Sequence, residues 1–409
     1  MRRVLFVCYG GGHVQMVIPC VKEMRRQGDW EPVVLGLTTA KPALEAAGIE
    51  SIGFHDFIQS GDERALEHGR RLAEANFTPG KGVSYDESVA YLGLCYADLE
   101  DRIGVESARH QYAATGRHAF LPVGPLHRIV ERVQPDLVVA TSSPKSELAA
   151  TIAARQLGVP SVAMIDLFGM EWEYFYKANY ADRVFVMSDG VRNDFLSRGR
   201  DPDSVVTTGN PAFDRLADPS LRIRGQTWRK NLGIGGTKLI LWTATPVLTE
   251  AQRAEVFVEL SRWLQMRPQW RLVFRPHPNM SYAPSQLPPG VLYGESTTDV
   301  AVQIHGADCV LVTISTTGIE AALLDKPVVK MCLTDPDFGP YHKIGLALPA
   351  EGMSDIGPTI ERALTDCPES RAVRDARRRL PSVGDAACNV VEQLALFAAE
   401  YRETLRRAG

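Results

Sequence analysis

The chain has 409 residues, of which 45% are hydrophobic and 23% are charged, and its formal net charge is −4. These values are typical of a globular protein with two or three domains, and nothing in them indicates a nucleic-acid-binding protein. No apolar run approaches the ~20 residues needed to span a bilayer. The seven cysteines have no paired spacing, which favours a reducing cytoplasm and argues against structural zinc.

The first half of the chain alternates short apolar runs with amphipathic stretches. Val4–Cys8 is predicted to be a buried strand, followed by the loop Gly10-Gly11-Gly12-His13 and a helix over Val14–Gln27. Arg2 and Arg3, with Arg25 and Arg26, make this end locally positive and leave room for a peripheral membrane contact. Further strands are predicted at Pro32–Leu37, Leu137–Ala140, Ser161–Ile165 and Arg183–Met187. Uniformly apolar strands between helices indicate a parallel sheet covered on both faces.

The same pattern restarts in the second half of the chain. Strands are predicted at Lys238–Trp242, Trp270–Arg275, Cys309–Val312 and Pro327–Met331, and helices include Glu250–Met266 and Gly318–Leu324. The fold class is therefore α/β, with two Rossmann-like, doubly wound domains facing each other across a cleft. Ligands usually bind beyond the carboxyl ends of such strands.

Breaks in this rhythm predict the domain boundaries. The N-terminal domain is assigned to residues 1–208, with a helical insertion over 56–120 that shapes a specificity surface. A linker rich in Gly, Pro, Asp and Arg follows over 209–236, and the C-terminal domain covers 237–389. The last segment, 390–409, is predicted to be an amphipathic helix.

The glycine-rich loop lies between a predicted strand and a predicted helix. Its glycines let backbone amides approach an anion or a sugar closely, so Gly11 and Gly12 are assigned to a phosphate or acceptor loop. His13 is a candidate general base or phosphate contact. The loop is not GxGxxG, and the acidic residue of a dinucleotide-binding fold is missing. The alternative is a plain tight turn with a surface histidine.

Arg275-Pro276-His277-Pro278-Asn279 lies at the carboxyl end of a predicted strand. The prolines restrict the backbone, and the guanidinium of Arg275 suits a phosphate. Arg275 is therefore assigned to donor binding and His277 to catalysis. The alternative is a rigid turn whose polar residues are incidental.

The segment Thr313–Glu320 also follows a strand and opens a helix. Its hydroxyls and amides can surround a diphosphate, and Glu320 can accept hydrogen bonds from two ribose hydroxyls. The donor-binding set comprises Thr245, Arg275, Ser315, Thr316, Thr317, Gly318 and Glu320. The alternative is a helix N-cap in which Thr317 and Glu320 form a capping box.

Acidic residues follow the strand that ends at Ile165. Asp166, Glu171 and Glu173 are candidate bases or acceptor contacts, and the alternative is that they are solvated loop carboxylates. Two Asp-x-Asp triplets, at Asp201/Asp203 and Asp335/Asp337, lie in Pro-containing turns, so we expect no metal site. Walker, GxSxG and HExxH motifs do not occur in the sequence.

These motifs together resemble the GT-B superfamily of glycosyltransferases, non-hydrolysing UDP-N-acetylglucosamine 2-epimerases and lipid-A-disaccharide-synthase-like enzymes. The loop with His13 looks like that of the peptidoglycan N-acetylglucosaminyltransferase. Arg275–Pro278 resembles the His-Pro motif of the epimerases, bacterial sialyltransferases and teichoic-acid glycerophosphotransferases. Ser315–Glu320, closed by Asp325-Lys326-Pro327, resembles the donor-binding helix of the group. The chain departs from the epimerase motifs at Ile165–Gly169 and at Leu333–Asp337, which argues against epimerase activity.

The resemblance implies a metal-independent glycosyltransferase that moves a sugar from a nucleotide-sugar, with UDP preferred, to an acceptor hydroxyl. The second domain would hold this donor, which is a substrate, and no cofactor is expected. The first domain would bind a carbohydrate, lipid-linked or small-molecule acceptor, with His13 or Asp166 accepting its proton. Three alternatives remain open: a UDP-sugar 2-epimerase or hydrolase, a cytidine-nucleotide-dependent sialyl- or glycerophosphotransferase, and a non-catalytic nucleotide-sugar-binding protein.

Overall fold

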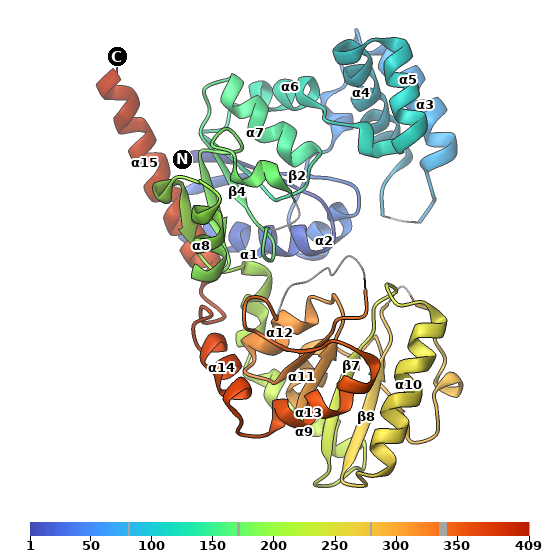
Figure 1. Ribbon diagram of the computed structural model, residues 1–409. Helices are drawn as coiled ribbons and strands as arrows, with labels where there is room; N and C mark the ends of the chain where they lie inside the picture. Colours follow the sequence, from blue (N-terminus) through green and yellow to red (C-terminus); the bar gives the residue numbers. More distant parts are fainter. Residues whose placement is uncertain (81, 170–171, 279, 335–341, 409) are drawn as a thin grey trace. The chain divides into compact units, whose positions relative to one another are not determined.

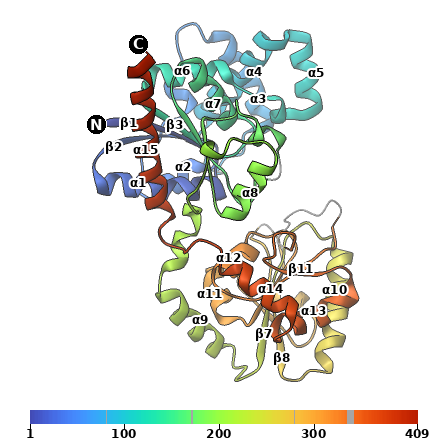
Figure 2. The same ribbon diagram turned by 60° about the vertical axis from the view of Figure 1, so that its left-hand side comes forward.

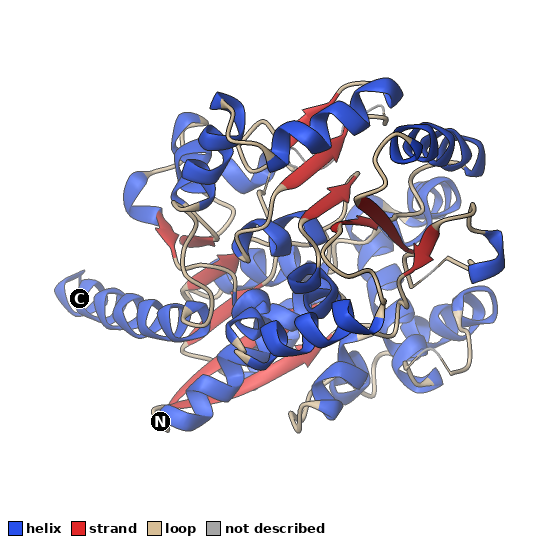
Figure 3. Ribbon diagram, turned by 90° about the horizontal axis from the view of Figure 1, so that it is seen from below, coloured by secondary structure: helices blue, strands red, loops and turns tan. Residues whose placement is uncertain are grey.

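The computed structural model describes residues 1–80, 82–169, 172–278, 280–334 and 342–408. The chain divides into two compact units, which are called unit 1 (Met1–Asp214 with Gly384–Gly409) and unit 2 (Arg215–Val383). Each unit is built on a six-stranded parallel sheet flanked by helices (Figure 1, Figure 3). The predicted α/β fold class with two Rossmann-like domains is confirmed.

The sheet of unit 1 has the strand order β2-β1-β3-β4-β5-β6. Its strands are β1 (Arg2–Cys8), β2 (Trp30–Gly36), β3 (Leu137–Ala140), β4 (Ser161–Met164), β5 (Arg183–Val186) and β6 (Val205–Thr207). After β1 the chain forms β2 on one side of β1, and it later forms β3 on the other side of β1. The carboxyl ends of β1 and β3 therefore form the switch point at which doubly wound sheets bind ligands.

Helices cover both faces of the unit 1 sheet. They are α1 (Gly12–Gln27), α2 (Ala40–Ala46), α3 (Glu63–Asn76), α4 (Tyr85–Ile103), α5 (Val105–Thr115), α6 (Val123–Val133), α7 (Ser146–Gln156), α8 (Asp189–Ser197) and α15 (Ala386–Ala408). Side chains of β1 alternate between two cores. Leu5 and Val7 pack toward α4 and α6, whereas Phe6 and Cys8 pack toward α1 and α15.

The C-terminal helix α15 completes unit 1, although it lies almost 400 residues from β1 in the sequence. Figure 2 shows it running beside α1, against which it packs. The carboxylate of Asp214 accepts hydrogen bonds from the backbone N–H groups of Gly384, Ala386 and Ala387, at 2.8–3.1 Å. Asp214 thereby satisfies N–H groups at the start of the helix that have no partner within it.

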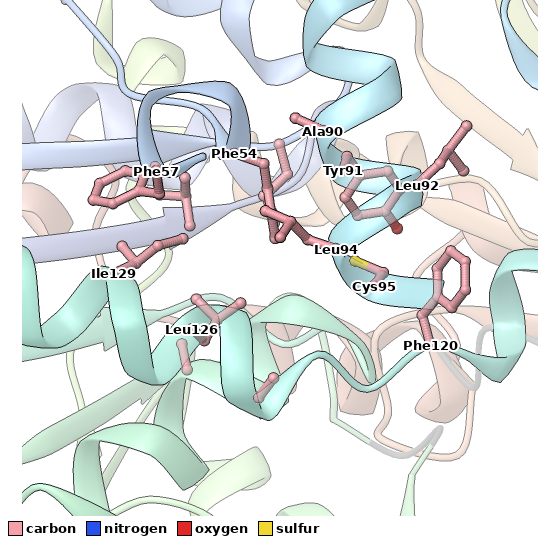
Figure 4. Close-up of a cluster of buried hydrophobic side chains, with 14 of the residues drawn as sticks. Phe54, Phe57, Ala90, Tyr91, Leu92, Leu94, Cys95, Phe120, Leu126 and Ile129 are labelled. Atoms are coloured by element: carbon pink, nitrogen blue, oxygen red, sulfur yellow. The ribbon is translucent and has the colours of Figure 1, made fainter. Parts of the chain in front are cut away.

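The segment predicted to be a helical insertion, 56–120, contains α3, α4 and α5, and its core joins that of the sheet. Tyr91 of α4 lies between Phe54 and Phe120 (Figure 4), with ring centroids 5.3 and 6.1 Å away. Helices α3 and α4 approach closely, because a Cβ atom on Gly93 would stand 2.0 Å from the carbonyl oxygen of Ala65. Only glycine allows this crossing.

The sheet of unit 2 has the strand order β12-β11-β10-β7-β8-β9. Its strands are β7 (Lys238–Thr243), β8 (Trp270–Arg275), β9 (Val291–Tyr293), β10 (Cys309–Val312), β11 (Val328–Met331) and β12 (Leu348–Ala350). Its helices are α9 (Ser220–Asn231), α10 (Glu250–Gln265), α11 (Val300–Gly306), α12 (Thr317–Leu323), α13 (Ile356–Leu364) and α14 (Pro368–Arg377). The switch point of this sheet lies between β7 and β10.

The segment 209–236, predicted to be a linker, instead contributes a packed helix to unit 2. Helix α9 crosses α11 closely, because a Cβ atom on Gly225 would stand 2.8 Å from the carbonyl oxygen of Val302. The polar composition of the segment hid this helix, which meets α11 through Gly225 and through Trp228, whose ring lies against Gly306. The division also places Asp214 in unit 1, and unit 2 ends at Val383 instead of 389.

Three edge or near-edge strands of three residues, β6, β9 and β12, are absent from the sequence-based prediction. They are too short to give a periodic signal, and Pro349 within β12 is tolerated because β12 is an edge strand. Among the helices that the structure describes, none combines the length and the apolar character that a membrane span requires.

Candidate functional site

The glycine-rich loop occupies the switch point of unit 1, directly after β1. Gly11 has φ 67° and ψ −135° and precedes the first residue of α1. This backbone conformation is strained for any residue with a side chain. A Cβ atom on Gly10 would stand 2.0 Å from Oγ1 of Thr39, so the loop also packs tightly against the segment that follows β2. The predicted roles of Gly11 and Gly12 remain predictions.

The structure brings His13 and Asp166 together. His13 lies in the first turn of α1, Asp166 follows β4, and Nε2 of the imidazole is 4.0 Å from Oδ2 of the carboxylate. Their side chains are 24% and 28% exposed, so both are partly buried. The backbone N–H of Asp166 donates to Oγ of Ser142, 3.2 Å away, in the loop that follows β3.

Burial sets the protonation of this pair. It lowers the pKa of His13, which the charge of Asp166 partly offsets, and it raises the pKa of Asp166, which the charge of His13 partly offsets. His13 is therefore neutral near pH 7 and able to accept a proton. A carboxylate beside it stabilises the imidazolium that results. Within the described part of the chain, Nδ1 of His13 is buried and has no hydrogen-bond partner.

A buried carboxyl group that the sequence analysis missed supports the same loop. Oε1 of Glu147, at the start of α7, accepts hydrogen bonds from the backbone N–H of Tyr9 at 3.0 Å and from the hydroxyl of Thr141 at 3.1 Å. Complete burial raises its pKa to about 7. Glu147 thus ties the loop after β1 to the loop after β3. The sequence could have pointed to Glu147, because it is an acidic residue that shortly follows β3, one of the two switch-point strands.

The other acidic candidates of unit 1 do not join this cluster in the described structure. Glu173 is exposed and opens a 3₁₀ turn, Glu173–Tyr176, whereas Glu171 lies outside the described residues. Asp201 accepts a hydrogen bond from the backbone N–H of Asp203, at 2.9 Å, which gives it a role in the turn. Asp335 and Asp337 lie outside the described residues, and the described residues contain no metal-binding cluster of His, Cys, Asp and Glu.

The switch point of unit 2 carries a network of hydroxyl groups. Oγ1 atoms of Thr243 and Thr317 are 2.6 Å apart, and those of Thr245 and Thr313 are 2.7 Å apart. The hydroxyl of Thr317 also donates to Oγ of Ser315 at 2.8 Å. These residues lie at or just beyond the carboxyl ends of β7 and β10. Of the predicted donor residues, Thr245 lies on the loop after β7, Ser315 and Thr316 lie on the loop after β10, and Thr317 and Gly318 begin α12.

Glu320, in the first turns of α12, forms a buried ion pair. Its side chain is 8% exposed, and Oε2 accepts a hydrogen bond from Nη2 of Arg215. Burial raises the pKa of Glu320, and the charge of Arg215 opposes this shift. Nη1 of Arg215 also contacts Asp299 at 3.2 Å. The capping-box alternative is wrong, because Thr316 is the N-cap and makes no side-chain cap. Sequence analysis missed Arg215, which is distant from Glu320 in the sequence.

Arg275 is buried and its guanidinium is occupied by the protein. Nη1 donates to Oε1 of Gln303 at 2.9 Å and to the carbonyl oxygens of Glu295 and Thr298 at 2.8 Å, and Nη2 donates to that of Ser296 at 2.9 Å. These contacts give Arg275 a positioning role for the segment between β9 and α11. Its predicted contact with phosphate stays a prediction. His277 is half-buried two residues further on, and Asn279 lies outside the described residues.

Comparison with solved structures identifies the fold. The UDP-N-acetylglucosamine 2-epimerase of Neisseria meningitidis, bound to UDP-GlcNAc, is similar with a TM-score of 0.61 and 14% identity, covering 96% of this chain and 99% of that one. S. aureus MnaA with UDP has a TM-score of 0.57 and 15% identity, covering 97% of each chain. The calicheamicin glycosyltransferase CalG4 has a TM-score of 0.60 and 15% identity, covering 98% of this chain and 99% of that one.

At the level of sequence, no protein-family model matches the chain, and no curated protein matches it either. The agreement in structure nevertheless extends over almost the whole chain, with both sheets included. The protein therefore has the GT-B fold that these 2-epimerases and glycosyltransferases share.

Proposed function

We propose that the protein is a glycosyltransferase that moves a sugar from a UDP-sugar to an acceptor hydroxyl. The observation that carries the proposal is the juxtaposition of His13 and Asp166, 4.0 Å apart, at the switch point of unit 1. A neutral, largely buried imidazole backed by a carboxylate is suited to accept the proton of a hydroxyl group. Structures similar to this one hold UDP or a UDP-sugar, which supports the choice of donor.

The proposed reaction follows from these groups. Nε2 of His13 accepts the proton of the acceptor hydroxyl as its oxygen bonds to the anomeric carbon of the donor sugar. The bond from that carbon to the diphosphate oxygen breaks, and the diphosphate leaves with the electron pair. Asp166 stabilises the imidazolium. The step needs no redox partner, and the proton balance closes when His13 releases its proton to water.

Unit 2 is proposed to bind the donor. The hydroxyl of Ser315, which accepts from Thr317, and that of Thr245 on the adjoining loop are the proposed neutral hydrogen-bond donors for a diphosphate. Glu320, held by Arg215, is assigned to the ribose hydroxyls. His277 keeps its predicted catalytic role near the phosphates, and Arg275, whose Nη atoms donate to backbone carbonyls, supports the adjoining segment.

A UDP-N-acetylglucosamine 2-epimerase is the second candidate, because several of the similar structures are such epimerases. The pair His13–Asp166 could also move a proton at a sugar carbon. Transfer is favoured by a separate pocket of about 190 Å³ within unit 1, lined in part by the helical insertion. An epimerase acts on one substrate, whereas a transferase also needs a place for its acceptor.

The first test is binding of UDP, CMP, GDP and TDP, measured as a shift in the midpoint of thermal unfolding. A ligand at one hundred times its Kd stabilises the protein by about 2.7 kcal/mol. We expect UDP to raise the midpoint of the wild type, Glu320→Ala to lose the shift, and Glu351→Ala to keep it. Glu351 is exposed and lies in the same unit, and its substitution by alanine removes the same charge. If no nucleotide raises the midpoint, the donor assignment is wrong.

The second test separates the two reactions. UDP-glucose and UDP-GlcNAc are incubated with the protein, with and without an acceptor mixture, and the products are identified by NMR. Acceptor-dependent release of UDP supports transfer. Acceptor-independent inversion at C2 of UDP-GlcNAc supports the epimerase instead.

A further inference from the structure

The pocket in unit 1 adjoins the glycine-rich loop. Its walls come from α4, the segment that follows α3, the segment that follows β2, and Arg117. Thr39 lines the pocket and is the residue against which Gly10 packs. Tyr91 also lines it, and its hydroxyl lies 3.1 Å from that of Tyr9, immediately before the glycines. The pocket and the loop that carries His13 therefore share a wall.

Among the described residues, Glu87 is the only acidic residue that lines this pocket, and its carboxylate accepts hydrogen bonds from the protein. Oε1 of Glu87 accepts from the backbone N–H of Phe54 at 2.9 Å. Oε2 accepts from the backbone N–H and from Nδ1 of His55, at 3.0 and 2.7 Å. The Glu87 side chain is 8% exposed. The carboxylate of Glu87 is thus held by the protein and exposes little of its surface to the pocket.

Two cations lie at or near the pocket. Arg117 lines it and Lys145 lies beside it, and among the described residues neither side chain makes a hydrogen bond or an ion pair, although both backbone carbonyls accept hydrogen bonds. The ammonium of Lys145 lies 5.9 Å from the ring centroid of Tyr9. Burial and the charge of Arg117 lower the pKa of Lys145, and the charge of Glu147 opposes this shift. Unpaired like charges repel each other and attract an anion.

The remaining walls and the volume limit the size of a ligand. Phe77, Tyr91 and Leu92 supply apolar surface, and Ser88 and Thr39 supply hydroxyls. A cavity of about 150 Å³ in another protein accommodates benzene. A pocket of about 190 Å³ therefore has room for one ring with a small substituent.

We propose that this pocket is the acceptor subsite, and that it selects a single-ring acceptor carrying a carboxylate or phosphate, whose charge is met by Arg117 and Lys145. This inference rests on the proposed function, since it assigns the substrate of the same reaction. The apolar walls hold the ring, the two cations hold the anionic group, and the shared wall directs the acceptor hydroxyl toward the loop that carries His13.

The test compares three probes by isothermal titration calorimetry: 4-hydroxybenzoate, phenyl phosphate and the neutral 4-hydroxybenzamide. We expect at least one anionic probe to bind about tenfold or more tightly than the amide, because a hydrogen bond between two charged groups is stronger than one that involves a neutral group. The anionic probe that binds more tightly indicates whether the acceptor carries a carboxylate or a phosphate. Arg117→Ala should weaken anion binding about tenfold, and Lys145→Met should weaken it less.

The matched control is Arg70→Ala, which removes the same charge from an exposed position on α3 that does not line the pocket. We expect this variant to bind like the wild type, and all three variants to unfold at the wild-type midpoint in the absence of ligand. Equal binding of the amide and both anions, or equal losses in Arg117→Ala and Arg70→Ala, would overturn the proposal.

A parallel measurement of the UDP-induced midpoint shift and of UDP-glucose turnover keeps the two proposals apart. If UDP binds and is released with other acceptors, but the anionic probes do not bind, only the acceptor proposal fails. If the anionic probes bind through Arg117 but no UDP-sugar is turned over, the pocket stands as an anion site and the proposed function fails.

Discussion

The two switch points of the molecule carry different chemistry. That of unit 1 holds titratable groups: His13, Asp166 and the buried Glu147. That of unit 2 holds threonine and serine hydroxyls, and its one strongly buried carboxylate, Glu320, is paired with Arg215. In both sheets these groups lie just beyond the carboxyl ends of the two switch-point strands, with the exception of Asp166, which follows β4, the neighbour of β3.

This difference indicates that the two switch points are suited to different tasks. Neutral hydroxyls hold a ligand without taking or giving up a proton near pH 7, which suits a binding site. Groups whose pKa values are shifted by burial can exchange protons at that pH, which suits acid–base chemistry. Under the proposed function, the switch point of unit 2 is the binding edge and that of unit 1 the proton-transfer edge, and the variants below break one edge at a time.

The largest effect is expected for His13→Ala. Removing the proposed base should lower kcat about 10²–10⁴-fold, while the UDP-induced midpoint shift, which belongs to unit 2, stays unchanged. Steady-state kinetics and thermal unfolding measure the two quantities. Loss of UDP binding with retained kcat would reverse the assignment of the two edges.

The pH dependence of kcat sharpens this prediction. His13 must be neutral to act as a base, so activity falls as pH decreases through its pKa, which burial places below the ordinary 6.5. Asp166→Asn removes the negative charge that favours the imidazolium, so the acid limb should move to still lower pH. An unchanged acid limb in this variant would show that the two residues do not interact in solution.

Next in size is the effect of Glu147→Gln on stability. The pKa of Glu147 is about 7 in the folded protein and 4.5 as its ordinary value, so the folded state holds its proton longer. Stability is therefore lost as pH rises from about 4.5 to 7, by roughly 3 kcal/mol in total. The glutamine keeps the acceptor oxygen for Tyr9 and removes this loss. Urea unfolding of both proteins at pH 5 and pH 8 measures this loss of stability. An equal loss in the wild type and in Glu147→Gln would contradict the prediction.

A smaller effect is expected for Arg215→Ala in unit 2. The variant leaves the carboxylate of Glu320 buried without its partner, which costs about 2 kcal/mol. The double variant Arg215→Ala/Glu320→Gln removes the unpaired charge and should recover part of this loss. Chemical denaturation of the four proteins of this cycle measures the coupling. Additive effects would show that the ion pair contributes nothing to stability.

The smallest effect is expected for Gly11→Ala. No atom lies within 4 Å of the added Cβ, so only the backbone conformation at φ 67° opposes the substitution, at about 1–2 kcal/mol. Gly12→Ala is the control, because Gly12 lies within α1 and its Cβ would stand 3.9 Å from Oδ2 of Asp166, an ordinary contact. Equal stabilities of the two variants would exclude strain at Gly11.

Much of the fold could be predicted from the sequence because the signals are local. Apolar runs such as Leu137–Ala140 and Cys309–Val312 are buried strands of parallel sheets, whose two-sided burial requires a continuous run of apolar residues. The loops with Gly11 and Ser315 were found for a similar reason, since each directly follows such a strand. The sequence also indicated the helical character of 56–120.

Only the tertiary structure decided which of these residues act together. His13 and Asp166 lie on different loops, and their proximity depends on the order of β1, β3 and β4 in the sheet, which no local pattern encodes. The partners of Arg275 and the pairing of Glu320 with Arg215 depend likewise on how distant segments pack. Secondary structure follows from neighbouring residues, whereas pKa shifts and hydrogen-bond partners follow from burial, which is a property of the folded chain.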